Sequence, residues 1–142
     1  MGKIMAIDYG TKRVGLAITD SLKIIATPLT TVQSSEILIF LQAYMKQENI
    51  ETLVVGMPKR LNNTSSPMTI IVEKFIKTLQ HMFPDKQIIS QDERYTSQIA
   101  SNSMIISGFK KKDRRNKDNV DKLSATIILQ SFLASSSKEH TL

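Results

Sequence analysis

Three acidic residues stand where regular elements of the sequence are predicted to end or begin, and together they could hold metal ions. Asp8 closes the first apolar run, Glu93 follows a later one, and Asp121 opens the last helical pattern. Oxygen ligands with open coordination positions suit Mg²⁺ or Mn²⁺. Two such ions roughly 4 Å apart activate a water and stabilise the leaving oxygen of a phosphodiester. If the three acids converge, they indicate metal-dependent phosphodiester hydrolysis.

Each acid also has an explanation without chemistry. Asp8 can cap a turn through its own backbone, as aspartate often does. Glu93 can pair with Arg94 or Lys86 on the surface, which contributes little. Asp118 and Asp121 have the spacing of a helix N-cap and the third helical residue, where acids favour the helix dipole. Periodicity therefore permits convergence of the acids and does not demonstrate it.

The elements that must position these acids alternate between strands and helices. Hydrophobic patterns predict strands at 3–8, 14–20, 23–27, 52–55 and 87–90. Helices are predicted at 35–45, 67–82, 96–107 and 119–135, with 28–35 and 59–66 as connections. We expect an α/β fold with a mixed sheet, a three-strand antiparallel meander followed by parallel strands, and helices on both faces. Ligands of such sheets bind outside the carboxyl ends of the parallel strands.

Local signals give three details of this plan. Gly10, in the five residues between the first two strands, is able to supply a positive φ. Ser35 is predicted as the N-cap of the first helix. Thr52–Val55 is short and continuously apolar, which is typical of a central strand covered on both faces.

Length and composition predict one domain. The 142 residues, 41% hydrophobic, can bury a core as a single domain spanning 1–142. Within it we expect a basic loop at 108–118 and a frayed tail at 136–142. No apolar stretch approaches the roughly 20 residues that span a bilayer, and no signal peptide is evident. The chain has no cysteine, which fits the reducing cytoplasm.

The positive charge is concentrated in one segment. The net charge is +6, and Lys110–Lys122 contains seven basic and three acidic residues, so this segment carries +4 of it. Such a cluster attracts polyanions, of which nucleic acid is the commonest in a cell. A solvated loop that aids solubility is the alternative. The candidate nucleic-acid contacts are Lys110, Lys111, Lys112, Arg114 and Arg115.

Four stretches, taken in order and at their intervals, resemble a known family. They are DYGTKRVGLAITD at 8–20, VGMP at 55–58, DERYTS at 92–97 and VDKLSATIILQ at 120–130. Together they are spread over almost the whole chain. In sequence and spacing they are similar to motifs of the YqgF family, also called RuvX. That family resembles RuvC-type resolvases within the ribonuclease H-like superfamily.

The resemblance implies a ribonuclease H-like fold with a five-stranded mixed sheet and a metal-dependent nuclease activity. Family members are described as nucleases that process the 5′ end of pre-16S rRNA, and earlier as Holliday junction resolvases. By motif match, Asp8, Glu93 and Asp121 are the catalytic residues and the ligands of two Mg²⁺ or Mn²⁺ ions. Lys12 and Arg13 match a basic pair at the first hairpin and are expected to hold backbone phosphates.

Two further residues match the family pattern with roles left open. Arg94 either contacts the substrate or orients Glu93, and Thr96 either contacts the substrate or caps a helix. Asp92 and Asp118 match no firm family position. Whether either adds a fourth metal ligand therefore stays open at the level of sequence.

Other functions compete with this interpretation. The D-x-G-T motif also resembles the phosphate loop of sugar kinases and actin-like ATPases, but those proteins need two such domains, and this chain supplies one. A non-catalytic nucleic-acid-binding factor is a third class. Between the nucleases, a junction resolvase must be a dimer to make paired cuts. No long exposed apolar stripe predicts a dimer face, so RNA is favoured over branched DNA, and the oligomeric state stays open.

Overall fold

A computed structural model describes residues 2–58, 67–92 and 117–140; for Asp92, 117–122 and 136–140 it describes the backbone course alone. The strands are β1 (Lys3–Tyr9), β2 (Arg13–Thr19), β3 (Ala26–Gln33), β4 (Ile50–Met57) and β5 (Gln87–Asp92). The described helices are α1 (Ile37–Gln47), α2 (Pro67–Met82) and α5 (Lys117–His140). A 3-10 turn at Ser34–Glu36 precedes α1. The predicted helix at 96–107 lies outside the described residues.

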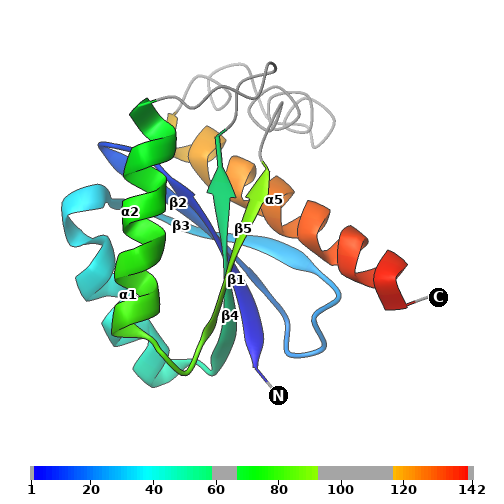
Figure 1. The fold of residues 1–142 in the computed structure, drawn as a ribbon. Helices are drawn as coiled ribbons and strands as arrows, with labels where there is room; N and C mark the ends of the chain where they lie inside the picture. Colours follow the sequence, from blue (N-terminus) through cyan, green and yellow to red (C-terminus); the bar gives the residue numbers. More distant parts are fainter. Residues whose placement is uncertain (1, 59–66, 93–116, 141–142) are drawn as a thin grey trace.

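The five strands form one mixed sheet in the order β3-β2-β1-β4-β5. β1 pairs with β2 and β2 with β3 in antiparallel fashion, whereas β1–β4 and β4–β5 are parallel. This confirms the predicted five-stranded mixed sheet, in which an antiparallel meander is followed by parallel strands. The carboxyl ends of β1, β4 and β5 therefore lie side by side at one end of the sheet, where the β1–β2 turn also lies (Figure 1).

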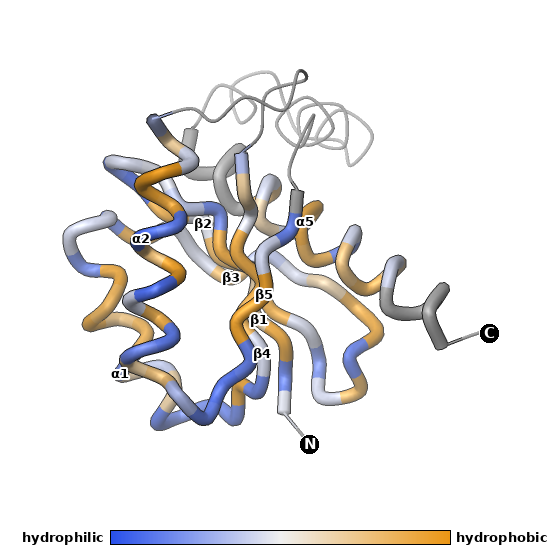
Figure 2. The backbone as a smooth tube through the Cα atoms, viewed as in Figure 1, coloured by the Kyte–Doolittle hydropathy of each residue, from blue (hydrophilic) through white to orange (hydrophobic). Residues whose placement is uncertain are grey.

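The larger hydrophobic core fills the space between the sheet and helices α1 and α2. Alternate residues of the strands point toward this side, because successive side chains of a strand face opposite ways. Figure 2 shows apolar residues along the strands, and apolar residues alternating with polar ones along α1 and α2. The members of this core include Met5, Ile7, Val14, Leu16, Leu53 and Val55 of the sheet, and Ile37, Leu41, Val72, Phe75 and Leu79 of the helices.

Helix α5 covers the opposite face of the sheet. It packs on β1, β2, β3 and β4, and residues 124–129 are all buried. The residues of this second core are small or aliphatic: Ile4, Ala6, Ala17, Val54, Ala125, Ile128 and Leu129. Small side chains at Ala6 and Ala17 allow a helix to lie close to the strands. The helix is longer at both ends than the predicted 119–135, since it begins at Lys117 and continues to His140.

The third strand is the main error of the sequence prediction. The sequence placed a strand at 23–27 and a connection at 28–35, whereas β3 spans Ala26–Gln33. β3 is an edge strand and mostly half-exposed, so it lacks a clear apolar alternation. Its Pro28 is accommodated at a register shift, where the partners of Leu16 and Ala17 are Thr30 and Pro28. Edge strands and bulges are where a sheet tolerates proline.

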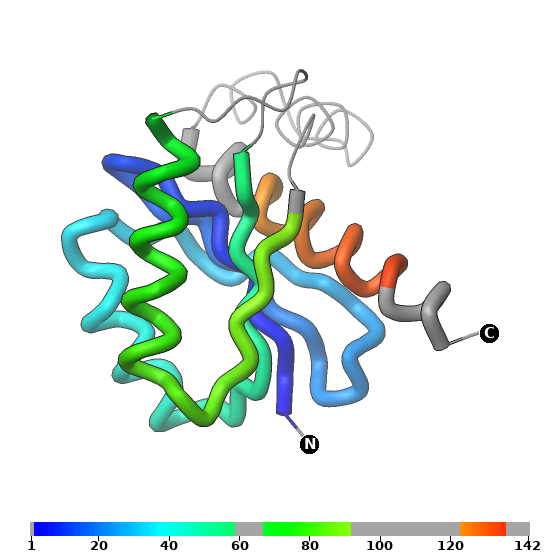
Figure 3. Tube along the Cα trace, viewed as in Figure 1, coloured from blue at the N-terminus to red at the C-terminus, as the bar shows by residue number. Residues whose placement is uncertain are grey.

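The apolar residues that suggested the earlier strand lie instead in the loop between β2 and β3. Ile24 and Ile25 are 68% and 62% exposed, and Leu22 is 66% exposed. The loop is nevertheless ordered by Asp20, whose Oδ1 accepts the backbone N–H groups of Ile24 at 2.9 Å and Ile25 at 3.0 Å. Asp20 therefore fixes the course of this loop directly after β2. In Figure 3 this loop lies at the opposite end of the sheet from the carboxyl ends of β4 and β5.

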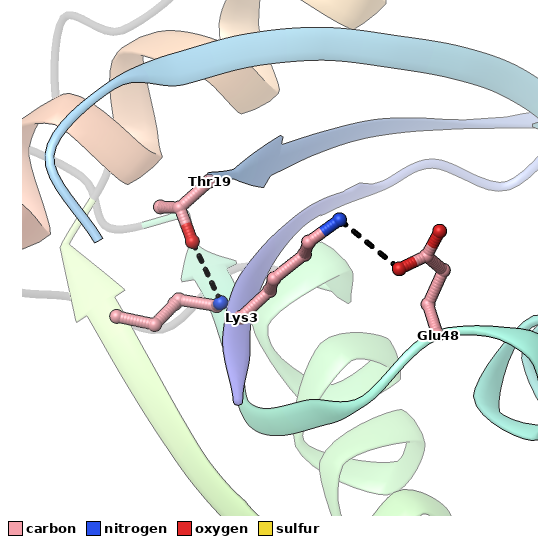
Figure 4. Close-up of polar contacts among 4 residues, drawn as sticks. Lys3, Thr19 and Glu48 are labelled. Carbon is pink, nitrogen blue, oxygen red and sulfur yellow. Dashed lines mark hydrogen bonds and ion pairs between the residues drawn. The ribbon is translucent and has the colours of Figure 1, made fainter. Parts of the chain in front are cut away.

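Polar contacts fix the amino end of β1 (Figure 4). The backbone N–H of Ile4 donates to Thr19 Oγ1 at 2.9 Å, and Lys3 Nζ lies 3.0 Å from Glu48 Oε2. Thr19 is buried, so this hydrogen bond satisfies a hydroxyl that would otherwise be costly to bury. The contacts link β1 to the end of β2 and to the residue after α1.

The helices begin close to the predicted positions, with two corrections. Ser35 is not the N-cap of α1, because it lies inside the 3-10 turn and α1 follows Glu36. In α2, helical spacing puts Ile71 on the apolar face with Val72, Phe75 and Leu79, but Ile71 is 36% exposed. Thr69 is buried instead, and its Oγ1 donates to the Pro58 carbonyl at 2.8 Å. Among the described helices, none is long and apolar enough to cross a bilayer.

Candidate functional site

Asp8 lies at the carboxyl end of β1, on the face of the sheet that α5 covers. It is the penultimate residue of the strand, not the last as predicted. Ile4 and Ala6 belong to the core beneath α5, and alternation puts Asp8 on their face. Asp8 is half-buried and takes part in a polar interaction within the fold. Its backbone is therefore part of the β1–β2 ladder.

Both strands beside Asp8 carry glycine at the neighbouring position. On β2 its direct partner is Gly15. On β4 the last described pair is Ile7 with Val55, so the next residue along is Gly56. Neither glycine adds a side chain next to the carboxylate. The two positions beside Asp8 on the sheet surface are therefore without side chains.

Gly10 makes the turn after Asp8 compact, although not in the predicted way. It does not adopt a positive φ; instead, a Cβ at this position would lie 2.5 Å from the backbone oxygen of Arg13. Ser34 holds the same turn from outside, since its N–H donates to the Lys12 carbonyl at 3.0 Å and its Oγ to the Thr11 carbonyl at 2.6 Å. The turn is therefore tied to the end of β3.

Lys12 and Arg13 line a groove at this end of the sheet. Its volume is about 570 Å³, and the described residues that line it are Lys12, Arg13, Thr31, Val32, Gln33 and Ser35. These six include two cations and no acid. The predicted phosphate contacts are thus placed beside hydroxyl and amide groups of β3 and the following turn. Thr31, Gln33 and Ser35 were missed, because no local motif marks them.

An aromatic pair anchors the residue after Asp8. Tyr9 stacks on Phe75 of α2, with ring centroids 4.2 Å apart and an interplanar angle of 25°. Tyr9 faces the core beneath α1 and α2, so it points away from the face of Asp8. Packing on one face of β1 therefore restrains the strand that carries the acid on the other.

The other two predicted ligands are placed only in part. Glu93 lies outside the described residues, directly after Asp92, which pairs with Met57 at the end of β5. Asp121 lies in the first turns of α5, four residues before the buried Ala125. Among the side chains that the structure describes, no group of three acids or histidines could hold a metal. The convergence of the three acids stays a prediction.

The remaining predicted site residues fall outside the described residues. These are Arg94, Thr96, Lys110, Lys111, Lys112, Arg114 and Arg115. Asp118 lies in α5, but its side chain is not described, and the same holds for Asp92 of β5. Whether Asp92 or Asp118 adds a fourth metal ligand therefore stays open.

Comparison with known proteins assigns the chain to a family. A family model described as "RuvX: Holliday junction resolvase" matches residues 2–135. The chain is 60% identical over 135 residues to the "Putative pre-16S rRNA nuclease" of Amoebophilus asiaticus (strain 5a2), covering 95% of this chain and 96% of that protein. Proteins of the same name from Christiangramia forsetii and Bacteroides fragilis (strain ATCC 25285) are 50% and 48% identical over 133 residues. Each match covers 94% of this chain, and 98% and 96% of the respective relative.

Among solved structures, the chain is similar to YeaZ from Pseudomonas aeruginosa, with a TM-score of 0.46 and 11% identity over 76% of this chain and 50% of that one. The family match spans nearly the whole chain, and it contains all four motifs identified in the sequence. The chain belongs to the RuvX family, also called YqgF.

Proposed function

We propose that this chain is a metal-dependent nuclease that hydrolyses phosphodiester bonds of pre-16S rRNA and processes its 5′ end. The observation that carries the proposal is the place of Asp8, at the carboxyl end of β1 and between two glycine positions, in a chain that is 60% identical to a protein named as such a nuclease. Carboxyl ends of parallel strands are the usual ligand-binding edge of sheets of this kind.

The donor set fits a hard divalent cation. Asp8, Glu93 and Asp121 would supply carboxylate oxygens alone, the ligands that suit Mg²⁺ or Mn²⁺. Two facts support their approach to one another. Glu93 follows β5, a strand parallel to β1 and separated from it by β4 alone. Asp121 belongs to α5, which packs on the face of Asp8. Mutual repulsion of such carboxylates is relieved by a cation between them.

When bound, two such ions would activate the attacking water and stabilise the leaving oxygen. The protein's own residues would do the rest. The three acids would hold the ions, and Lys12 and Arg13 would bind phosphates of the substrate strand beside the scissile bond. Lys110, Lys111, Lys112, Arg114 and Arg115 would add sequence-independent attraction for the strand. Arg94 and Thr96 would support Glu93 or the substrate at the end of β5.

RNA is the proposed substrate because the curated relatives are named for pre-16S rRNA. Branched DNA is the second candidate, since the matching family model is described by Holliday junction resolution. A resolvase makes paired symmetric cuts and so requires a dimer. A nuclease that trims an rRNA end has no such requirement. A binding factor without turnover is the third outcome.

One experiment separates these functions. The purified protein is incubated with 5′-extended pre-16S rRNA fragments, with unrelated single-stranded RNA and with four-way DNA junctions, each with Mn²⁺, with Mg²⁺ or with chelator. We expect metal-dependent cleavage of the rRNA fragment in preference to both other substrates. Paired cuts in the junction, with no cleavage of RNA, would instead establish the resolvase. Binding of RNA without cleavage under any metal would establish the non-catalytic factor.

A further inference from the structure

The groove beside the β1–β2 turn has features that the three metal-binding acids do not explain. Its lining joins Lys12 and Arg13 of the turn to Thr31, Gln33 and Ser35 from β3 and the turn before α1. None of these last three residues has a role in the proposed chemistry. Their side chains carry hydroxyl and amide donors, which bind phosphate oxygens without reading sequence.

Three residues that line the groove, Arg13, Thr31 and Gln33, lie on the same face of the sheet as Asp8, whereas Val32 projects from the other face. Arg13 pairs with Gln33, Gly15 with Thr31, and Gly15 with Asp8. Directly paired residues of antiparallel strands project from the same face. From Asp8 on β1 to Thr31 on β3 is two strand spacings, about 10 Å.

The walls of the groove are fixed by the backbone. The hydrogen bonds from Ser34 to the carbonyls of Lys12 and Thr11 join the turn to the end of β3. The β2–β3 ladder continues to the Arg13–Gln33 pair at the groove itself. Groups positioned by rigid elements lose less entropy when they bind a ligand. Lys12 and Gln33 are both exposed, so they are accessible to a strand that crosses this edge.

From these observations we propose that the groove is an anchoring site for the phosphates of the substrate strand, a short distance beyond the scissile bond, with Gln33, Thr31 and Ser35 as positioning residues beside Lys12 and Arg13. The proposal rests on the proposed nuclease function for the identity of the strand. Its ligand chemistry is the phosphodiester backbone, which RNA and DNA share. The substrate would run from Asp8 across the β1–β2 turn to the end of β3.

Binding without turnover tests the groove. Fluorescence anisotropy measures the affinity for a labelled single-stranded RNA of about 16 nucleotides, in chelator so that no cleavage occurs. Gln33→Glu places a negative charge in the groove and should raise Kd about tenfold. Gln80→Glu makes the same charge change at an exposed position of α2 and should leave Kd within about twofold. Lys12→Ala should reduce the salt slope of log K by about 0.7.

The same measurement with DNA of equal sequence checks the chemistry. Equal losses for RNA and DNA are expected of a phosphate contact, and a loss confined to RNA would overturn it in favour of 2′-hydroxyl recognition. If Gln33→Glu and Gln80→Glu bind the RNA with equal affinity, the groove is not part of the RNA-binding surface. If Gln33→Glu weakens binding but the wild type cleaves no substrate, the phosphate-binding role of the groove is supported and the nuclease function is refuted. In cleavage assays, Gln33→Glu should raise KM.

Discussion

Asp8 of β1 and Gly15 of β2 are direct partners in the antiparallel ladder, and both lie on the face of the sheet that α5 covers. The glycine adds no side chain beside the carboxylate, and Gly56 continues the pattern on β4. Asp8 is thus the one described acid of the predicted set whose surroundings the structure defines. The hydrogen-bonded β1–β2 ladder lies on one side of Asp8 along the chain, and the compact turn with Lys12 lies on the other.

The first prediction concerns Gly10, which the turn after Asp8 requires. Gly10→Ala should lower the free energy of unfolding by about 1–3 kcal/mol, because its Cβ would lie 2.5 Å from the Arg13 carbonyl oxygen. Urea denaturation measures the loss. Thr11→Ala, an exposed change in the same turn, is the control and should cost less than about 0.5 kcal/mol. Equal stability of the two variants would contradict the close approach.

The stack between Tyr9 and Phe75 should contribute beyond simple burial. Phe75→Leu keeps an apolar side chain but removes the ring contact, and it should cost about 1 kcal/mol more than the matched change Phe83→Leu. Phe83 is a buried phenylalanine outside this stack. Phe75→Ala should cost about 3–5 kcal/mol through the cavity it leaves. Indistinguishable leucine variants would show that the stack adds nothing.

Asp20 should make the β2–β3 loop sensitive to acid. Hydrogen bonds from the N–H groups of Ile25 and Ile24 lower the pKa of its carboxyl from the ordinary 3.8. Its contribution to stability is therefore present above pH 3.8 and is lost as the pH falls through the lowered, folded-state pKa. Asp20→Asn keeps an acceptor oxygen that does not titrate. The stability advantage of the wild type over Asp20→Asn should shrink on acidification, as followed by urea denaturation at several pH values. A difference that stays constant with pH would refute the role of the carboxylate.

The basic segment should act through charge alone. Replacing Lys110, Lys111 and Lys112 with alanine should weaken RNA binding and reduce the slope of log K against log salt by about 2, since each neutralised phosphate of a single strand contributes about 0.7. Filter binding over a range of salt concentrations measures the slope. Alanine at the exposed Lys46, Lys74 and Lys77 is the control with the same charge change. Equal salt slopes for the two triple variants would instead support the explanation that the segment is a solvated loop.

Much of the fold could be predicted because its central elements carry local signals. The buried strands β1, β2 and β4 are continuous apolar runs, and α1 and α2 show helical spacing with clear starts. β3 could not be predicted in the same way. It is an edge strand without a fully buried residue, so the exposed Ile24 and Ile25 gave a stronger apolar signal than Thr30 and Val32, which pair in the sheet.

The residues of the candidate site likewise differ in whether a local sequence signal marks them. Asp8, Lys12 and Arg13 were predicted from one contiguous motif, and the structure places them at one edge of the sheet. Gln33 and Ser35 reach the same groove only through the register of β3 on β2, which no local pattern encodes. Glu93 lies outside the described residues, and its role rests on the family motif.

Metal-dependent cleavage by Asp8→Asn, compared with the wild type, tests the central claim most directly. Asparagine preserves size and the β1–β2 ladder, so the melting temperature should change by no more than a few degrees, while the carboxylate ligand is lost. We expect Mn²⁺-dependent cleavage of a 5′-extended pre-16S rRNA fragment to fall by a factor of about a thousand, because a bound ion contributes several kcal/mol to the transition state. Gln33→Glu should retain metal-dependent turnover at saturating substrate. Cleavage by folded Asp8→Asn at the wild-type rate would contradict the assignment of Asp8 as a metal ligand.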